Sequence, residues 1–423
     1  MKKNKFVKFI SIVCVCLCMG LCFAGCDDNA NGKKGNGILD PIDQEKWLLG
    51  GCEIATDTMD GGEDGATSEW CAQMAGAFGA KSQRVWMHIP TVIKRAKDSD
   101  ALSVKRYEAD KYHKYFRLLK ENGVERIVAM NHRFLYPFDF ENPQNKVDIV
   151  LHPHKDPELY AKWVQMYYEC YRLLASEFTE VTFWEPENEF DNNKFGSDES
   201  ALTPDDMGFI AADLCYAANK GIKEINPKNV CVYPGLTCNN YSPVVLEASY
   251  EYIENKTLPT IEEHYVNDPD AYFDVVAWHP YAFAENAAAR VKSVSLEYYD
   301  IMKAHGDGEK RVFLTEFGMS EDWRKQSENP QDVIAQEFAE AIEVIKGELP
   351  FVETVFLFRY ASLYGWTSSD SKENTFGLFY SPSDPVNRGK PKPVALAIYR
   401  AVYGENADVS PLYVYSKEFG ITE

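Results

Sequence analysis

Eight short apolar runs of strand-like composition recur along the chain, and helical periodicity follows each of them. Strands that alternate with helices form right-handed crossovers, which place the strands side by side in a parallel sheet. Eight such units within residues 45–405 predict an α/β fold, a (β/α)8 TIM barrel built as a single domain. The expected strands lie in KWLLGGCEIA, SQRVWMHIP, ERIVAMNHR, EVTFWEPENE, NVCVYPGLT, FDVVAWHPYA, RVFLTEFG and ETVFLFRYA.

A doubly wound open sheet is the alternative arrangement for the same alternation. Such sheets often carry a glycine-rich phosphate loop directly after the first strand. The glycine-rich segment 61–65 lacks the spacing and the strand-to-helix step of that loop. The barrel is therefore favoured.

The composition of the 423 residues is that of a soluble globular protein, with 45% hydrophobic and 26% charged residues. The formal net charge of -21 argues against nucleic acid as a partner, because phosphate contacts need basic patches. Aromatic residues make up 13% of the chain, which suits a protein that stacks planar or sugar-ring ligands. We expect the protein to be a monomer.

The first 25 residues have the pattern of a bacterial lipoprotein signal peptide. Residues 1–8 are rich in lysine, and residues 9–24 are apolar but too short for a comfortable membrane span. The small residues Ala24 and Gly25 then precede Cys26. The resemblance implies that Cys26 is lipidated and becomes the first residue of the mature chain. An ordinary cleaved secretion signal with an incidental cysteine is the alternative.

A lipidated Cys26 would attach the protein to the bacterial cell surface, with the lipid as its only contact with the membrane. Residues 26–44 would then be a polar surface tether, and residues 406–423 a C-terminal tail packed on or beside the barrel. Six further cysteines are scattered without a CxxC pair, so neither a zinc site nor a compact disulfide framework is indicated. A few could pair outside the cell, but buried free thiols are expected for Cys52, Cys71, Cys170, Cys215, Cys231 and Cys238.

Three glutamates stand at every second position of residues 183–191, namely Glu185, Glu187 and Glu189. Most acid-rich stretches are solvated loops, and that is one interpretation. The other is a catalytic carboxylate at the end of a buried strand, because barrels carry their catalytic residues there. Glu189 is expected to end the fourth strand and Glu316 the seventh, which puts them across the barrel mouth from each other. Two carboxylates facing across a cleft are the arrangement that cleaves glycosidic bonds.

Four segments together resemble the motifs of clan A glycoside hydrolases, including the cellulase-like and β-xylosidase-like members. WEPENEF resembles the W-E-x-x-N-E-P segment at the end of strand four, and LTEFG resembles the segment that ends strand seven. AWHPYA resembles the H-x-Y element of strand six, and Arg84 matches the arginine at the end of strand two. The four segments occur in the expected order and span nearly the whole mature chain.

The resemblance implies a retaining double-displacement mechanism. Glu316 matches the nucleophile, Glu189 matches the acid/base, and Asn188 matches the residue that binds the sugar 2-hydroxyl. The acid could instead be Glu187 or Glu185, which are the alternatives within the same segment.

The segment departs from the pattern of the family at two positions. Glu187 stands where an apolar or aromatic residue is usual, and Phe190 replaces the usual proline. Glu185 matches a structural carboxylate of the barrel. Arg84 could neutralise Glu185, and it could also keep the nucleophile ionised.

Further binding residues are expected on neighbouring strands. His279 and Tyr281 are expected to bind the sugar or to position the nucleophile, although they could merely pack under a loop. His132 ends the third strand, where it could face the sugar. Trp366 follows the eighth strand, where family members present a tryptophan platform for the sugar at the cleavage point.

Neither a metal nor an organic cofactor is expected. His152 and His154 have the spacing of metal-hydrolase ligands, but those enzymes place the pair at strand one, whereas this pair lies in the loop after strand three. Two carboxylates can supply the nucleophile and the proton donor without a metal.

The sequence therefore predicts a single catalytic domain, a retaining glycoside hydrolase that cleaves β-linked oligo- or polysaccharides outside the cell. The alternative from another class is a catalytically inactive glycan-binding surface lipoprotein on a degenerate barrel. Loss of either key glutamate would mark such degeneracy. Both glutamates are present, which favours the enzyme.

Overall fold

Eight parallel strands form one sheet in the order β7-β6-β5-β2-β1-β10-β9-β8. The computed structural model describes residues 39–58, 65–96, 99, 101–131, 154, 157–191, 202–255, 266–364 and 373–422. The barrel belongs to the compact unit Asn36–Glu423. The strands are β1 (Leu49–Cys52), β2 (Ser82–Trp86), β5 (Arg126–Met130), β6 (Phe183–Glu185), β7 (Val230–Cys231), β8 (Val276–Ala277), β9 (Val312–Phe317) and β10 (Val352–Phe358).

The two ends of this sheet meet, so the strands close into a barrel. Parallel bridges join Val232 to Val275 and Leu236 to Trp278, directly beyond β7 and beside β8. The first strand lies next to the last, and every other neighbour is the next large strand along the chain. A doubly wound sheet would instead reverse its strand order near the middle. The predicted (β/α)8 barrel is confirmed.

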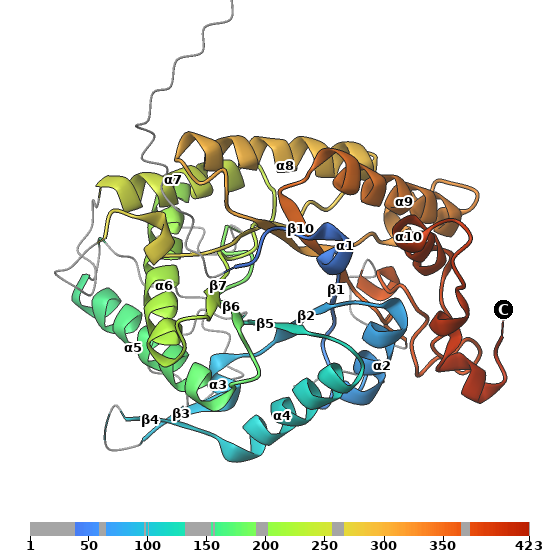
Figure 1. The fold of residues 1–423 in the computed structure, drawn as a ribbon, viewed down its shortest axis with the longest axis horizontal. Helices are drawn as coiled ribbons and strands as arrows, with labels where there is room; N and C mark the ends of the chain where they lie inside the picture. The colour runs from blue at the N-terminus through green and yellow to red at the C-terminus, as the bar shows by residue number, and fades with distance from the viewer. Residues whose placement is uncertain are drawn as a thin grey trace, which may run out of the picture. The chain divides into compact units, whose positions relative to one another are not determined.

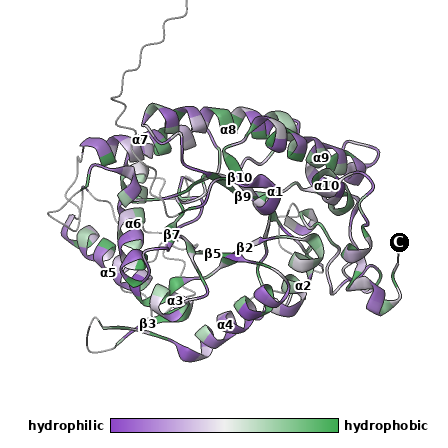
Figure 2. Cartoon of the chain, in the orientation of Figure 1, coloured by the Kyte–Doolittle hydropathy of each residue, from purple (hydrophilic) through white to green (hydrophobic). Residues whose placement is uncertain are grey.

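Helices surround the strands and cover the outside of the sheet (Figure 1). Hydrophilic and hydrophobic residues alternate along these helices, as expected where one face packs on strands and the other meets water (Figure 2). The larger helices are α2 (Ser68–Phe78), α4 (Arg106–Glu121), α5 (Pro157–Glu177), α6 (Pro204–Ile225), α7 (Ser242–Asn255), α8 (Ala287–Ala304), α9 (Pro330–Glu348) and α10 (Pro393–Tyr403).

Local signals in the sequence set where these helices begin. Pro204 occupies the first turn of α6, and Thr203 and Asp206 form a reciprocal capping box before it. Pro330 and Pro393 stand at the starts of α9 and α10.

Shorter elements fill the connections. They are the helices α1 (Gln44–Trp47) and α3 (Ile89–Val92), the antiparallel pair β3 (Ile93–Arg95) and β4 (Leu102–Val104), and the 3-10 turns η1 (Pro269–Ala271), η2 (Glu321–Arg324), η3 (Glu373–Thr375), η4 (Ser410–Tyr413) and η5 (Ser416–Phe419).

The C-terminal residues lie against the barrel's outer shell. Leu412 and Tyr413 are buried, and the ring of Tyr415 meets Trp70 of α2 edge-on at 6.3 Å.

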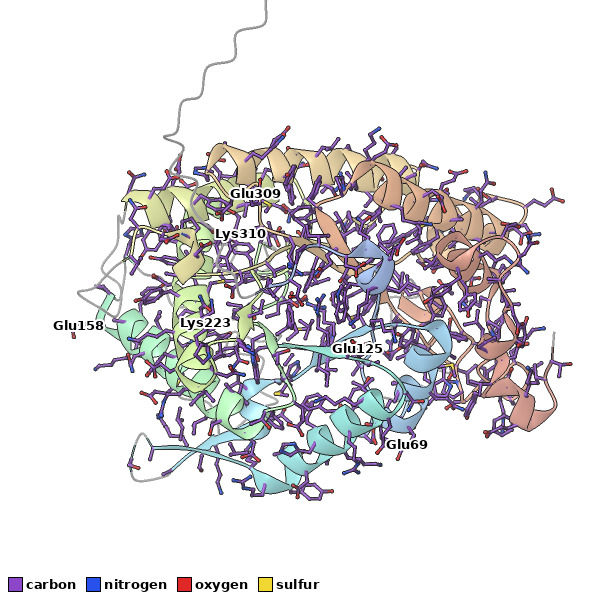
Figure 3. All side chains as sticks on the ribbon, in the orientation of Figure 1. Glu69, Glu125, Glu158, Lys223, Glu309 and Lys310 are labelled. Carbon is purple, nitrogen blue, oxygen red and sulfur yellow. The ribbon has the colours of Figure 1, made fainter. Side chains whose placement is uncertain are left out.

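Two lysines labelled in Figure 3 form ion pairs on the outer part of the barrel. Lys223 pairs with Asp274, and Lys310 pairs with both Asp270 and Asp307. Within the described residues, no helix combines the length and apolar composition that a membrane span needs.

The barrel interior holds an apolar layer with polar layers above and below it. The six cysteines expected as free thiols are buried, and none of them forms a disulfide within the described residues. Cys52 belongs to this interior layer. The apolar layer consists of Cys52, Val128, Phe183, Val230, Val232, Val275, Ala277, Phe313 and Phe356.

A charged cluster closes the amino-terminal end of the barrel. Arg126 donates to Glu353 at 2.7 Å, and Arg311 donates to the other oxygen of the same carboxylate. Glu353 is fully buried, and both arginines are 6% exposed. The guanidinium of Arg126 also lies over the rings of Trp47 and Phe183, at 3.9 and 4.5 Å. One carboxylate, that of Glu353, therefore pairs with two buried guanidinium groups beneath the apolar layer.

We expect Glu353→Ala to lower the free energy of unfolding by about 3 to 5 kcal/mol, because it leaves two buried guanidinium groups without their anion. Urea unfolding of the purified protein measures the change. Glu353→Gln is the matched control, and it should lose less because it keeps the volume and one hydrogen-bond acceptor. Equal, small losses in both variants would show that the cluster contributes little.

Candidate active site

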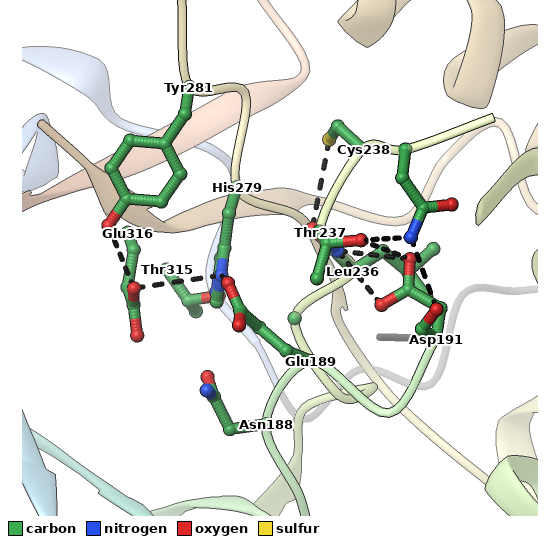
Figure 4. A network of polar contacts seen from close by, with 12 residues as sticks. Asn188, Glu189, Asp191, Leu236, Thr237, Cys238, His279, Tyr281, Thr315 and Glu316 are labelled. Carbon is green, nitrogen blue, oxygen red and sulfur yellow. Dashed lines mark hydrogen bonds and ion pairs between the residues drawn. The ribbon is translucent and has the colours of Figure 1, made fainter. Parts of the chain in front are cut away.

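The carboxyl ends of β2, β6, β8 and β9 bring six of the predicted site residues into one cluster. Figure 4 labels its members other than Arg84. Each side chain contacts at least one other member through a hydrogen bond or ion pair. The cluster lies above the apolar layer of the barrel, at the end where barrels carry their chemistry. Its members are Arg84, Asn188, Glu189, His279, Tyr281 and Glu316.

Arg84 of β2 is the centre of this cluster. Its Nε and Nη2 donate to the Glu185 carboxylate at 2.6 and 3.0 Å. Its Nη1 donates to Glu316 Oε1 at 2.7 Å, and Nη2 also donates to Asn188 Oδ1 at 2.5 Å. Arg84 and Glu185 are fully buried. One guanidinium therefore links the ends of β2, β6 and β9.

Both oxygens of the Glu316 carboxylate accept hydrogen bonds from buried donors. Arg84 approaches Oε1, and the Tyr281 hydroxyl donates to Oε2 at 2.8 Å. Glu316 is only 5% exposed. Two donors, one on β2 and one in the segment after β8, hold this carboxylate in one orientation, and the charge of Arg84 complements it.

Glu189 lies four residues beyond the end of β6, rather than on the strand itself. Its backbone has φ 48, in the left-handed region that a side-chain-bearing residue seldom adopts. Its N–H donates to the carbonyl of Gly235 at 2.8 Å. Its side chain is 27% exposed, compared with 7% for Glu316 and 0% for His279. Glu189 can therefore reach a ligand in the barrel mouth.

His279 lies between the two carboxylates (Figure 4). Its Nδ1 is 3.1 Å from Glu189 Oε1 and 3.8 Å from Glu316 Oε2. Its Nε2 is 2.9 Å from Thr315 Oγ1. Burial alone would lower the pKa of His279, but the charge of Glu316 and the hydrogen bond and charge of Glu189 outweigh it and raise this pKa above 6.5. The ring is therefore protonated over a wider pH range than a solvent-exposed histidine.

Gly235 explains how the loop after β7 comes so close to these groups. A Cβ at this position would lie 2.2 Å from His279 Nε2 and 2.5 Å from Thr315 Oγ1. The Gly235 N–H donates to Glu185 Oε1 at 3.0 Å, and Asn188 pairs with Gly235 in a parallel bridge. Only glycine allows this approach of backbone to side chain.

Asp191 ties the Glu189 segment to the loop after β7. Its carboxylate accepts from the Thr237 N–H at 2.9 and 3.0 Å, from the Thr237 hydroxyl at 2.9 Å and from the Ser242 hydroxyl. Asn239 donates to the Asp191 carbonyl at 3.1 Å. Figure 4 shows this network beside Glu189. It supports the backbone that follows the left-handed residue.

Glu187 is not part of a solvated loop. Its carboxyl group is fully buried, and Oε1 accepts from Asn131 at 2.7 Å and from Tyr167 at 2.8 Å. Burial dominates and raises the pKa of Glu187 well above its usual value, with the charge of Glu185 adding to the effect. These two donors lie at the end of β5 and on α5, so their contacts with Glu187 hold its segment against both elements.

Three groups in the cluster have the spacing of metal ligands. One atom each from Glu189, His279 and Glu316 lies within 4.8 Å of the other two. Each of these side chains also makes the hydrogen bonds or ion pairs given above, which account for the same spacing without an ion. Of the two histidines with metal-ligand spacing, from which no metal site was expected, His154 places Nε2 3.3 Å from Asp206 Oδ1, and His152 lies outside the described residues.

Three further predicted site residues, Cys26, His132 and Trp366, lie outside the described residues. Phe358, which the sequence analysis does not single out, ends β10 with a half-buried ring 6.5 Å from that of Tyr281. An aromatic residue at the end of the eighth strand was the signal available for it. Thr315 and Gly235 were also missed, because their contacts depend on the loop after β7.

The structure is similar to solved glycoside hydrolases. A family 39 glycoside hydrolase from the gut symbiont Bacteroides cellulosilyticus WH2 matches with a TM-score of 0.54 and 17% identity, over 86% of this chain and 65% of that chain. A GH5_18 protein from Bifidobacterium longum subsp. infantis matches with a TM-score of 0.54 and 15% identity, over 84% of this chain and 78% of that chain.

A GH10 endoxylanase from a sugarcane soil metagenome matches with a TM-score of 0.53 and 15% identity, over 85% of this chain and 97% of that chain. The chain thus spans just under two thirds of the family 39 structure and nearly all of the endoxylanase. No protein-family model matches this chain, and no curated protein does either. The likeness establishes the fold, which is a (β/α)8 barrel.

We expect His279→Gln to destabilise the protein more at acidic than at alkaline pH. Because the folded-state pKa of His279 is raised, its stabilising contribution is fully present below about pH 6.5 and is lost as the pH rises through the folded-state value. Thermal unfolding of the wild type and the variant between pH 5 and 9 measures the difference in Tm. A difference that grows with pH would contradict the charge assignment.

Proposed function

We propose that the protein is a retaining glycoside hydrolase, with Glu316 as nucleophile and Glu189 as acid/base. One observation carries the proposal. One carboxylate oxygen of Glu189 lies within 4.8 Å of one carboxylate oxygen of Glu316 across the barrel mouth. Retaining glycosidases hold their two carboxyl groups about 5 to 5.5 Å apart, whereas inverting ones need about 6.5 to 9.5 Å to admit a water.

In the first step, a Glu316 oxygen attacks the anomeric carbon while the glycosidic bond to the leaving group breaks. Glu189 donates its proton to the departing oxygen, so the leaving group departs as a neutral alcohol. Tyr281 and Arg84 each bind one oxygen of Glu316, which aligns the carboxylate for attack. The product of this step is a covalent glycosyl-enzyme.

In the second step, the ionised Glu189 accepts a proton from water, and the oxygen of that water attacks the anomeric carbon. The bond to Glu316 breaks and its carboxylate is restored, so the sugar keeps its original configuration. His279 donates to Glu189 when protonated and so supports the ionised form that serves as the base. These steps use two carboxylates and a water, and we propose no cofactor for them.

The substrate that we propose is a β-linked oligo- or polysaccharide. Asn188, held by Arg84 beside Glu189, would bind the sugar 2-hydroxyl next to the reacting carbon. The solved structures that resemble this chain include a GH10 endoxylanase and a β-xylosidase, which supports a carbohydrate substrate. We propose that the reaction takes place outside the cell, on a protein attached to the membrane through Cys26.

The two glutamates can be separated by the products that azide forms with activated aryl β-glycosides. Glu316→Ala should lose activity by several orders of magnitude, and azide should then yield the α-glycosyl azide by direct displacement. Glu189→Ala should still form the glycosyl-enzyme from activated substrates but should fail on poor leaving groups. Azide entering from the face that the acid has vacated should then give the β-glycosyl azide. NMR of the products reads the stereochemistry.

Glu187→Gln is the matched control, because it changes a carboxyl group two residues upstream and keeps its shape. This variant should show the leaving-group dependence of the wild type and no azide product. Exchange of the two azide stereochemistries would exchange the proposed roles. Binding of glycans without hydrolysis by the wild type would favour the inactive glycan-binding alternative.

The membrane anchor is tested separately. We expect Cys26→Ala to shift the protein from the membrane fraction to the medium or the periplasm, because no thiol remains to accept the lipid. Fractionation and immunoblotting of cells that express each form measure the shift. Cys71→Ala, which removes a buried thiol instead, should leave the distribution unchanged. Equal membrane association of all forms would refute the anchor.

A further inference from the structure

Five aromatic side chains gather at the carboxyl ends of β8, β9 and β10. Ring centroids lie 4.7 Å apart for Phe283 and Trp323, and 5.0 Å apart for Trp323 and Phe376. Tyr281 lies 6.2 Å from Trp323, and Phe358 lies 5.6 Å from Phe376. The contacts join the rings into one group, which we call the aromatic cluster.

The aromatic cluster is buried at its inner end and open at its outer end. Tyr281 and Phe376 are each 8% exposed, whereas Phe283 is 55% exposed and Trp323 is half-buried. An apolar ring that stays in water beside a second half-open ring is unfavourable unless something covers it. Exposed apolar patches of this kind commonly mark binding surfaces.

A partly buried ion pair holds the open end in place. Arg324, the neighbour of Trp323, donates to both oxygens of Glu337 on α9, at 2.8 and 2.7 Å. The same guanidinium donates to the carbonyls of Phe283 and Glu285, at 3.0 and 2.8 Å. One arginine therefore fixes the backbone that carries both exposed rings. A surface held in this way loses little conformational entropy when a ligand binds.

The aromatic cluster is continuous with the proposed active site. Tyr281 contacts Phe283, Trp323 and Phe376 through its ring, and its hydroxyl donates to Glu316 Oε2. A chain of substrate that reaches Glu316 from this side must pass over the rings. The C–H face of a pyranose is apolar and flat enough to stack on such rings, while its hydroxyl groups stay in water.

We propose that Phe283 and Trp323 form a subsite for a neutral sugar unit of the substrate, beyond the unit whose bond is cleaved. The inference rests on the proposed function and adds that the enzyme favours oligosaccharides over single glycosides. The sugar is neutral because the whole chain carries a net charge of -21. An anionic sugar would be repelled by this field.

The test compares substrates of different length in the same variants. The substrates are p-nitrophenyl β-glucoside, β-xyloside and β-mannoside, together with the matching β-1,4-linked oligosaccharides of two to five units. For the sugar that the wild type cleaves, the ratio of kcat/KM on oligosaccharide to kcat/KM on monoglycoside should fall roughly tenfold in Phe283→Ala/Trp323→Ala. Trp323→Phe keeps a ring and should lose less. Tyr107→Ala, which removes a 74% exposed ring on α4, should leave the ratio unchanged.

A binding measurement keeps the test independent of turnover. In Glu316→Gln, the same oligosaccharides should change the tryptophan fluorescence, and adding Trp323→Phe should remove most of this change. An unchanged ratio in a folded double variant, or an equal loss on both substrate classes, would overturn the subsite. If the wild type hydrolyses no substrate of the panel, the result counts against the proposed function, and the fluorescence titration alone decides the subsite.

Discussion

The buried guanidinium of Arg84 is the contact on which the site depends. It joins Glu185, Asn188 and Glu316, which come from β6, the segment after it, and β9. A cation with no exposed surface is tolerable only when anions and acceptors surround it. Arg84 therefore holds these strand ends in register. Removing it would leave Glu185 and Glu316 as two buried acids without their common partner, so the same contact serves both the barrel and its chemistry.

Glu189 needs a different kind of support, because it lies outside the strand and has an unfavourable backbone conformation. The loop after β7 supplies that support through the Gly235 carbonyl and through the bonds that Thr237 and Ser242 make to Asp191. Glu187 also stabilises the segment, because its carboxyl group accepts hydrogen bonds from Asn131 and Tyr167. Glu316, the proposed nucleophile, is thus held by buried donors, while Glu189, the proposed acid/base, has a more open carboxylate on a firmly supported turn. The more open carboxylate of Glu189 suits a group that must exchange protons with both the leaving group and water.

Most of the fold could be predicted because barrel strands are short, apolar and evenly spaced. Arg84 on β2 and Glu316 near the end of β9 could be assigned to the mouth for the same reason, since a parallel barrel gathers all carboxyl ends at one face. The exact length of β6 could not be predicted, and Glu189 lies beyond it. Glu187 could not be distinguished from a solvated acid by its sequence neighbours, because its burial depends on Asn131 and Tyr167 from distant segments.

By itself, the sequence determined the alternation of strands and helices, the identity of the polar residues at each strand end and their order around the barrel. The positions of the strands and helices follow from local periodicity. The order of the strand ends follows from the barrel topology that this periodicity implies. Only the tertiary structure decided which of the three glutamates faces the barrel mouth, why residue 235 is glycine, and that Phe283 lies against Trp323. Each of these depends on contacts of a few ångströms between segments far apart in the chain, and the packing of the whole barrel sets those distances.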